Sequence, residues 1–336
     1  MMKTTLHRTA IWLERALDPL IPVAPNKPPV IDAYLGYATP TRLILRGRVL
    51  IGLRRTQPDP RHGWFTNLRQ MLSLFFTNEV AGVPVRAVTF NRTVVTDEEG
   101  YFTLDVPRSE LDPGWHAIPL TIPGVDSSDT LADVLVNNSA ADYGVISDID
   151  DTMMETGAYS ILRNLWTSLT GSALTRKVFP DAVELIERLH DDHNPVYYVS
   201  SSPWNLHAFL ETVLFKRAGL VRGPLFLRDL GVSETQFISG THGDHKGLQI
   251  DRLFEAHPGL GFVLIGDSGQ HDAEVYRDAA ARWPGRVRRV LMRDADPTPA
   301  PEVAAALDDL RAMGIPVWRG RDYTPLLTEE AIDIRK

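Results

Sequence analysis

The sequence predicts an α/β protein in which a doubly wound parallel sheet follows a small β-sandwich domain. From about residue 139 onward, apolar runs of strand length alternate with helical stretches, as in parallel βαβ units. From about 30 to 138, successive strand-like runs are instead separated by turn signals. Acidic and polar residues follow several of the apolar runs after 139. These positions correspond to the carboxyl ends of the strands, where open α/β sheets bind their ligands.

The sequence of the N-terminal part predicts one helix, a linker and the β-sandwich. Residues 5–18 have the apolar periodicity of an amphipathic helix, and the prolines from Pro19 to Pro29 end it, so that 1–29 forms a helix with a proline-rich linker. Residues 30–138 form the β-sandwich domain, in which a second amphipathic helix over 62–77 is inserted. Its strand candidates are 41–50, 83–90, 101–106 and 115–122.

The third region, 139–336, contains the predicted parallel sheet. Helices are expected over 181–190 and 206–218, as well as after Lys246. The strand candidates are 143–147, 196–200, 224–228, 261–266, 287–292 and 315–318.

Composition excludes several classes of function. The net charge of −8 argues against a protein that tracks nucleic-acid phosphates, which usually has a basic balance. The chain has no cysteine, so disulfides, thiolate metal sites and cysteine nucleophiles are excluded. No segment has the length and apolarity of a membrane span, and the first 21 residues lack the apolar core of a secretory signal, so we expect a cytoplasmic protein.

Three carboxylates end the first predicted parallel strand. The run from Tyr143 to Ser147 continues into Asp148, Asp150 and Asp151 within four residues. A capped turn would explain a single aspartate at such a place, but a cluster of three is better explained by a divalent cation that neutralises it. Carboxylate oxygens suit Mg²⁺, so the sequence favours a magnesium site.

Further polar motifs follow in order along the chain. Ser200 and Ser201 end the second predicted strand, Lys246 precedes a helix, and Asp267 ends the strand 261–266. Such a set can transfer a phosphoryl group through a carboxylate nucleophile. Mg²⁺ would be held by Asp148, Asp267 and a backbone carbonyl near Asp150, while Ser200, the amides that follow it and Lys246 would meet the phosphoryl oxygens.

The motifs resemble those of a known family. The runs 148–152 and 266–272, together with Ser200 and Lys246, are similar to the four motifs of haloacid dehalogenase-superfamily phosphatases. More narrowly, 147–152, 198–204, His245-Lys246 and 265–270 resemble the phosphatidate phosphatase catalytic domain of fungal actin-patch proteins and their bacterial relatives. The resemblance covers about 139–336 and implies a haloacid dehalogenase-like fold.

The resemblance also implies a role for each residue. Asp148 would be the nucleophile, and Asp150 would protonate the leaving alkoxide and then deprotonate the attacking water. Ser200, Ser201 and Lys246 would bind the phosphoryl group, although Ser201 and Ser202 are equally well explained as caps of a helix starting near Pro203. The metal would be bound by Asp148, Asp150 and Asp267. Asp272 would orient Lys246 or a water bound to the metal, and Thr152 would stabilise the turn after the nucleophile.

The implied function is a Mg²⁺-dependent phosphomonoesterase, with phosphatidate as the best substrate. One alternative keeps the chemistry and changes the substrate to a protein, nucleotide or sugar phosphate. Another is a binding module without catalysis, which the intact motifs disfavour. No nucleic-acid partner is expected, and the oligomeric state is left open.

Access to the site bears on the substrate. The interval from Glu155 to Pro180 is too short for an elaborate lid, which suits a bulky or surface-presented substrate such as a phospholipid. The amphipathic segments 5–18 and 62–77 are candidates for a peripheral membrane contact. Packing of both segments on the β-domain is the favoured interpretation, because their faces are not strongly basic.

Overall fold

The computed structural model describes residues 28–51, 80–108, 110–126, 128–155, 178–228, 242–294 and 300–328. The helices expected over 5–18 and 62–77 lie outside these residues. Most of the interval 155–180, which was predicted to be too short for an elaborate lid, lies outside them too.

The N-terminal β-region forms one seven-stranded sheet, called sheet A, in the order β4-β3-β6-β7-β1-β2-β5. All its strand pairs are antiparallel except β1 with β7. The edge strands β4 and β5 contact each other, so the sheet is nearly closed, and the expected β-sandwich is not confirmed. The strands are β1 (Pro29–Ala38), β2 (Arg42–Ile51), β3 (Pro84–Ala87), β4 (Arg92–Val95), β5 (Tyr101–Pro107), β6 (Gly114–Thr121) and β7 (Thr130–Val136).

Two features of sheet A differ from the sequence expectation. The strand predicted over 83–90 ends at Ala87, and a tight turn, in which Asn91 has a positive φ of 50°, leads into the unpredicted strand β4. Asparagine adopts this conformation more readily than most residues, because its short polar side chain tolerates it. Strands β1 and β7 were not predicted; they pair in the middle of the sheet.

The C-terminal region contains a six-stranded parallel sheet, called sheet B, in the order β10-β9-β8-β11-β12-β13. Within sheet B the chain first forms the central strand β8 and then adds β9 and β10 on one side. It then returns to add β11, β12 and β13 on the other side. This is the predicted doubly wound topology, and its switch point lies between β8 and β11. The strands are β8 (Gly144–Ser147), β9 (Val196–Pro203), β10 (Leu225–Arg228), β11 (Phe262–Asp267), β12 (Val287–Arg293) and β13 (Val317–Gly320).

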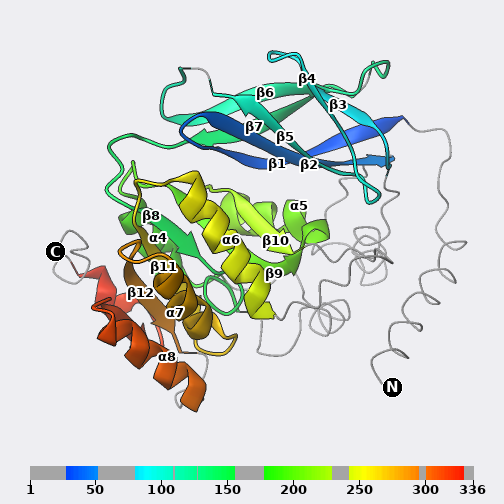
Figure 1. The fold of residues 1–336 in the computed structure, drawn as a ribbon. Coiled ribbons are helices and arrows are strands. Elements are labelled where there is room, and N and C mark those ends of the chain that lie inside the picture. Colours follow the sequence, from blue (N-terminus) through cyan, green and yellow to red (C-terminus); the bar gives the residue numbers. More distant parts are fainter. Residues whose placement is uncertain are drawn as a thin grey trace, which may run out of the picture.

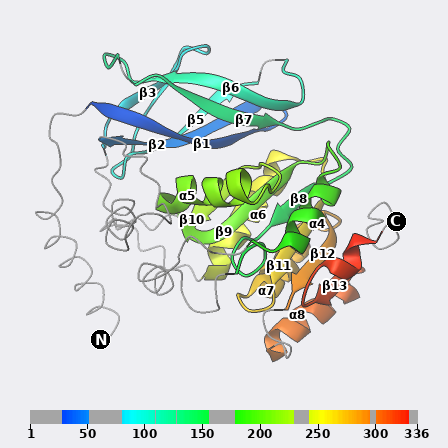
Figure 2. The same ribbon diagram turned by 180° about the vertical axis from the view of Figure 1, so that it is seen from behind.

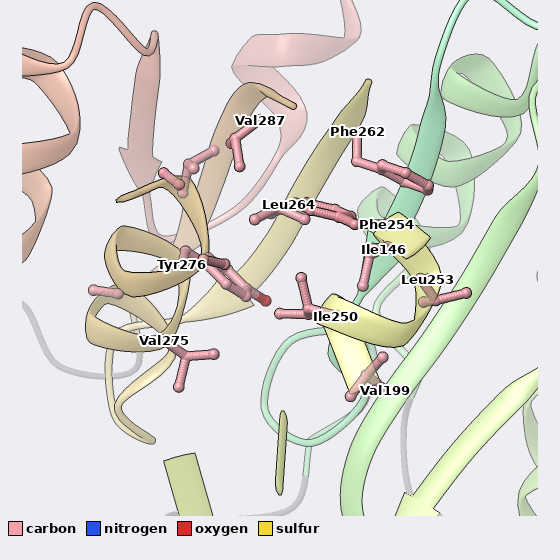
Figure 3. Close-up of a cluster of buried hydrophobic side chains, with 14 of the residues drawn as sticks. Ile146, Val199, Ile250, Leu253, Phe254, Phe262, Leu264, Val275, Tyr276 and Val287 are labelled. Atoms are coloured by element: carbon pink, nitrogen blue, oxygen red, sulfur yellow. The ribbon is translucent and has the colours of Figure 1, made fainter. Parts of the chain in front are cut away.

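Helices cover both faces of sheet B (Figures 1 and 2). One face packs on α6 (His242–Ala256), α7 (Asp272–Arg282) and α8 (Pro301–Ala312). Ile146 and Leu264 of the sheet meet Phe254 of α6 and Tyr276 of α7 in this layer (Figure 3). The opposite face packs on α4 (Pro180–His190), η3 (Trp204–Leu206), α5 (His207–Glu211), η4 (Thr212–Arg217) and η5 (Thr324–Leu327).

Sheet A lies against the β9–β10 side of the α/β region (Figures 1 and 2). Asp133 of β7 forms an ion pair of 2.5 Å with Arg222. Asn137, just after β7, donates to the hydroxyl of Tyr197 on β9 at 2.8 Å, and that hydroxyl lies 2.7 Å from Nε2 of His257. The two regions are therefore joined by partly buried polar contacts, and Tyr37 of sheet A packs in the apolar core of the α/β region. Among the described helices, none is long and apolar enough to cross a bilayer.

Candidate active site

Two strand ends at the switch point carry the central acids. Asp148 follows the fully buried strand β8, and Asp267 is the last residue of its neighbour β11. After β8 the chain turns tightly, with Asp151 at a φ of 58° and the amide of Met153 bonded to the carbonyl of Ile149 at 2.9 Å. Asp272 opens helix α7, five residues after Asp267.

The structure brings Asp148, Asp267 and Asp272 together with Lys246. The three carboxylates each offer an oxygen within 4.8 Å of the others, and all three side chains are buried. Lys246 Nζ lies 2.7 Å from Asp148 Oδ1 and 2.5 Å from Asp272 Oδ1. The switch point of the sheet thus gathers three acids around one buried ammonium group.

Burial and mutual repulsion shape the ionisation of this cluster. Burial, followed by the charges of Asp272, Asp267 and Asp150, raises the pKa of Asp148 well above its usual range, although Lys246 opposes the shift. Burial together with Asp272 raises the pKa of Asp267 to about 8. Burial alone would lower the pKa of Lys246, but Asp148 and Asp272 outweigh it and raise that pKa. One ammonium group therefore does not neutralise the cluster.

The donor set of this cluster fits a divalent cation. Asp267 Oδ1 accepts a hydrogen bond of 2.6 Å from the amide of Gly269, whereas Asp267 Oδ2 is buried with no hydrogen-bond partner among the described residues. A buried carboxylate oxygen without a donor is costly unless a cation binds it. Oxygens of Asp148 and Asp267 are hard ligands of the kind that Mg²⁺ prefers. The carboxylate of Asp150 is not part of this group of three.

Asp150 lies instead among the serines that end β9. Its Oδ2 accepts hydrogen bonds from Ser200 Oγ at 2.8 Å and from Ser202 Oγ at 3.1 Å. Ser200 Oγ also accepts the amide of Ser202 at 2.9 Å. Neither Ser201 nor Ser202 caps the following turn, whose N-terminal residue Pro203 makes no side-chain cap, so the capping alternative is wrong for both. The buried Ser201 Oγ has no hydrogen-bond partner within the described part of the chain.

Thr152 and Arg293 fix the turn that carries Asp148. Thr152 Oγ1 donates to Asp148 Oδ2 at 3.1 Å, and Arg293 Nε donates to the carbonyl of Thr152, also at 3.1 Å. Arg293 is itself held by Asp181 at 2.5 Å and lies over the rings of Phe179 and Tyr323. Sequence reasoning missed Arg293, because its partners are distant in the chain and a basic residue ending a strand is not by itself a signal.

The described residues on either side of 156–177 lie next to each other. Met154 forms a bridge with Val178, and the amide of Phe179 donates to the carbonyl of Met153 at 2.9 Å. Both ends of this interval are thereby attached beside the Asp148 turn.

Comparison with known proteins identifies one family model and two fungal relatives. Residues 143–294 match the model described as the catalytic domain of phosphatidate phosphatase APP1. The chain is 26% identical over 239 residues to phosphatidate phosphatase APP1 of Saccharomyces cerevisiae, covering 67% of this chain and 40% of that protein. It is 23% identical over 210 residues to an uncharacterised protein of Schizosaccharomyces pombe, covering 60% of this chain and 34% of the relative. The chain thus spans less than half the length of either relative, and the matched segment contains Asp148, Asp150, Ser200, Lys246, Asp267 and Asp272.

Proposed function

We propose that this protein is a Mg²⁺-dependent phosphatase that acts through an aspartyl phosphate, with phosphatidate as its substrate. The observation that carries the proposal is the position of Asp148. It directly follows strand β8 at the switch point of a parallel sheet, in contact with Lys246 and close to Asp267, inside the segment that matches a phosphatase catalytic domain. Such a position suits a carboxylate that attacks phosphorus.

The residues of the site can be assigned to two chemical steps. In the first, an oxygen of Asp148 forms a bond to phosphorus while the bond to the substrate oxygen breaks, and Asp150 gives a proton to the departing alkoxide. In the second, Asp150 takes a proton from water as the water oxygen bonds to phosphorus, and phosphate leaves Asp148. Lys246 donates hydrogen bonds to the phosphoryl oxygens throughout, and the Ser200 hydroxyl, which donates to Asp150 in the structure, turns to donate to them when substrate binds.

Asp148 and Asp267, with a backbone carbonyl near Asp150, would hold the metal. When bound, Mg²⁺ supplies positive charge that the single ammonium group of Lys246 does not provide for the three acids and the phosphoryl oxygens. The unpartnered Asp267 Oδ2 and the raised pKa values of Asp148 and Asp267 support this part of the proposal.

Phosphatidate is proposed because the matched family model and the Saccharomyces cerevisiae relative carry its name. Product would be diacylglycerol and inorganic phosphate. The proposal also includes a cytoplasmic location with a peripheral contact to the bilayer that presents the lipid. The same chemistry on a protein, nucleotide or sugar phosphate is an outcome that the test distinguishes.

The test is phosphate release by the full chain, with Mg²⁺ and with chelator, on phosphatidate in neutral liposomes or detergent and on a panel of soluble phosphomonoesters. We expect turnover of phosphatidate that needs Mg²⁺. Asp148→Asn should abolish it, because an amide is a poor nucleophile and a poor ligand, while the fold remains intact by circular dichroism. Turnover of soluble esters alone would reject the lipid substrate, and near-normal activity of Asp148→Asn would reject the aspartyl phosphate.

A further inference from the structure

The turn that follows the active-site serines is held by sheet A. Trp204, two residues after Ser202, stacks on Tyr34 of β1 with ring centroids 4.7 Å apart and planes within 9°. The ring of Tyr34 also lies 4.4 Å from that of His207. Tyr34 is buried, so this contact is part of the packed interface between the two regions.

A second contact comes from β2. Arg48 Nη1 donates to Asn205 Oδ1 at 3.1 Å. Arg48 is only 4% exposed and is fixed from its own side, because its Nε donates to the carbonyl of Glu99 at 2.9 Å and its guanidinium lies 4.3 Å from the ring centre of Tyr101. The donor that meets Asn205 is therefore rigid.

A third contact ties the same region to β10. Arg46, also on β2, lies 5.2 Å from the ring centre of Trp204 and 4.3 Å from that of Phe226. Its Nη2 donates to the carbonyls of Leu35 and Leu225, each at 3.2 Å. Sheet A thus contacts the Trp204 turn by stacking, by a cation over a ring and by a hydrogen bond.

We infer that sheet A is a positioning element of the active site, in which Tyr34 and Arg48 hold Trp204 and Asn205 and thereby keep the preceding serines aligned with Asp150. The serine hydroxyls lie 2.8 and 3.1 Å from Asp150, so a small shift of the turn would break these bonds. Displacements of about 1 Å at a catalytic group can lower turnover about 100-fold. The segment 143–294 that matches the family model begins after sheet A, so that model assigns sheet A no such part.

This inference rests on the proposed phosphatase activity for one of its readouts, so a second readout is independent of activity. The variants are Tyr34→Leu, Arg48→Met and the milder Asn205→Ala, all in the full chain. Arg42→Met is the matched control, because Arg42 is also an arginine of β2 but makes an exposed ion pair with Asp105. Thermal unfolding of each variant identifies any that fail to fold.

We expect Tyr34→Leu and Arg48→Met to lower kcat at least about tenfold with little change in KM, whereas Arg42→Met matches the wild type. Adding Asn205→Ala to Arg48→Met should cause no further loss, because the two residues act through one hydrogen bond. Hydrogen exchange of a peptide covering 200–206 should be faster in Tyr34→Leu and Arg48→Met but not in Arg42→Met.

Unchanged kcat in folded Tyr34→Leu, Arg48→Met and Asn205→Ala would overturn the inference, even if their exchange is faster. Losses that multiply in the Arg48→Met, Asn205→Ala pair would overturn it too. A wild-type chain that releases no phosphate from any substrate would instead reject the proposed function. In that case the exchange comparison alone decides whether sheet A holds the serine turn.

Discussion

Asp148 and Asp150 are two residues apart, yet their surroundings differ in charge. Asp148 faces an ammonium group and two other carboxylates, whereas Asp150 accepts hydrogen bonds from two neutral serine hydroxyls. Two carboxyl groups in such different environments can serve different roles, one as a nucleophile and the other in proton transfer. The different contacts of Asp148 and Asp150 thus support the two different roles proposed for them.

Asp150→Asn should remove proton transfer from the active site without changing the stability of the fold. The amide oxygen still accepts from Ser200 and Ser202, so thermal stability should stay near that of the wild type. Turnover of an alkyl phosphate should fall by about 10² to 10⁴, the usual range for a general acid–base group. Turnover of p-nitrophenyl phosphate should fall less in its first step, because that leaving group needs no proton. Burst kinetics measure this step, and an equal loss of the first step on both esters would contradict the assignment.

The residues that end the strands could be predicted from the sequence, because the motifs that carry them are local. Asp148 and Asp267 meet as the topology requires, since parallel strands on either side of a switch point end at one edge. Asp272 joins them from the start of α7, and Lys246 joins them from inside α6 rather than from before that helix. The contacts of Arg293, Tyr34 and Arg48 could not be predicted. Each depends on a partner far away in the sequence, and only the packing of whole elements brings these pairs together.

At the scale of elements, the junction of β11 and α7 is packed with little spare room. A Cβ atom on Gly266 would lie 2.5 Å from Asp272 Oδ2 and 2.7 Å from the hydroxyl of Tyr276. That hydroxyl donates to the carbonyl of Ile265 at 2.7 Å. Glycine at this position lets α7 approach the strand closely enough for Asp272 to reach Lys246.

Gly266→Ala should therefore destabilise the fold by about 1–3 kcal/mol, the range for overpacked interiors, and lower activity as well. The expected cause is displacement of Asp272, which loosens its contact with Lys246. Gly259→Ala is the control, because a Cβ atom there would meet nothing within 4 Å. Urea unfolding and phosphatase assays of both variants provide the measurement, and a Gly266→Ala protein as stable and active as Gly259→Ala would refute the packing argument.

Element boundaries were predictable only where local pattern decides them. Strands β9, β11 and β12 lie within a few residues of the predicted ranges, because each is a buried apolar run. The single helix predicted over 206–218 is instead an α-helical turn followed by the π-helical segment η4. The single sheet A likewise follows from pairing between strands far apart in the chain, such as β1 with β7, which periodicity along one strand does not reveal.

At the scale of the whole molecule, the two regions share a buried histidine. His257 lies between Asn137 at the end of β7 and Tyr197 of β9. Burial lowers its pKa to about 4, and the charges of Arg286 and Arg108 add to the shift. Its ring also packs against Tyr37 of sheet A, so protonation would put a charge inside the interface.

Stability should consequently fall as the pH drops from about 6.5 to about 4. Between these values the unfolded chain binds a proton at this histidine and the folded chain does not, so acid favours unfolding. The contribution of this group is on the order of 3 kcal/mol across that window. Urea unfolding as a function of pH should show a flatter profile in His257→Gln than in the wild type. Identical slopes for the two proteins would exclude His257 as the source.

The bridge between Met154 and Val178 affects how the sequence between these two residues can vary in evolution. Since the interval between these residues starts and ends at one point, the two anchors stay at the same separation whatever the length of chain that joins them. Closing a longer loop costs only about 0.6 kcal/mol for each doubling of its length. Insertions and exchanges of sequence between these two anchors therefore cost the fold little, and the turn that carries Asp148 keeps its place.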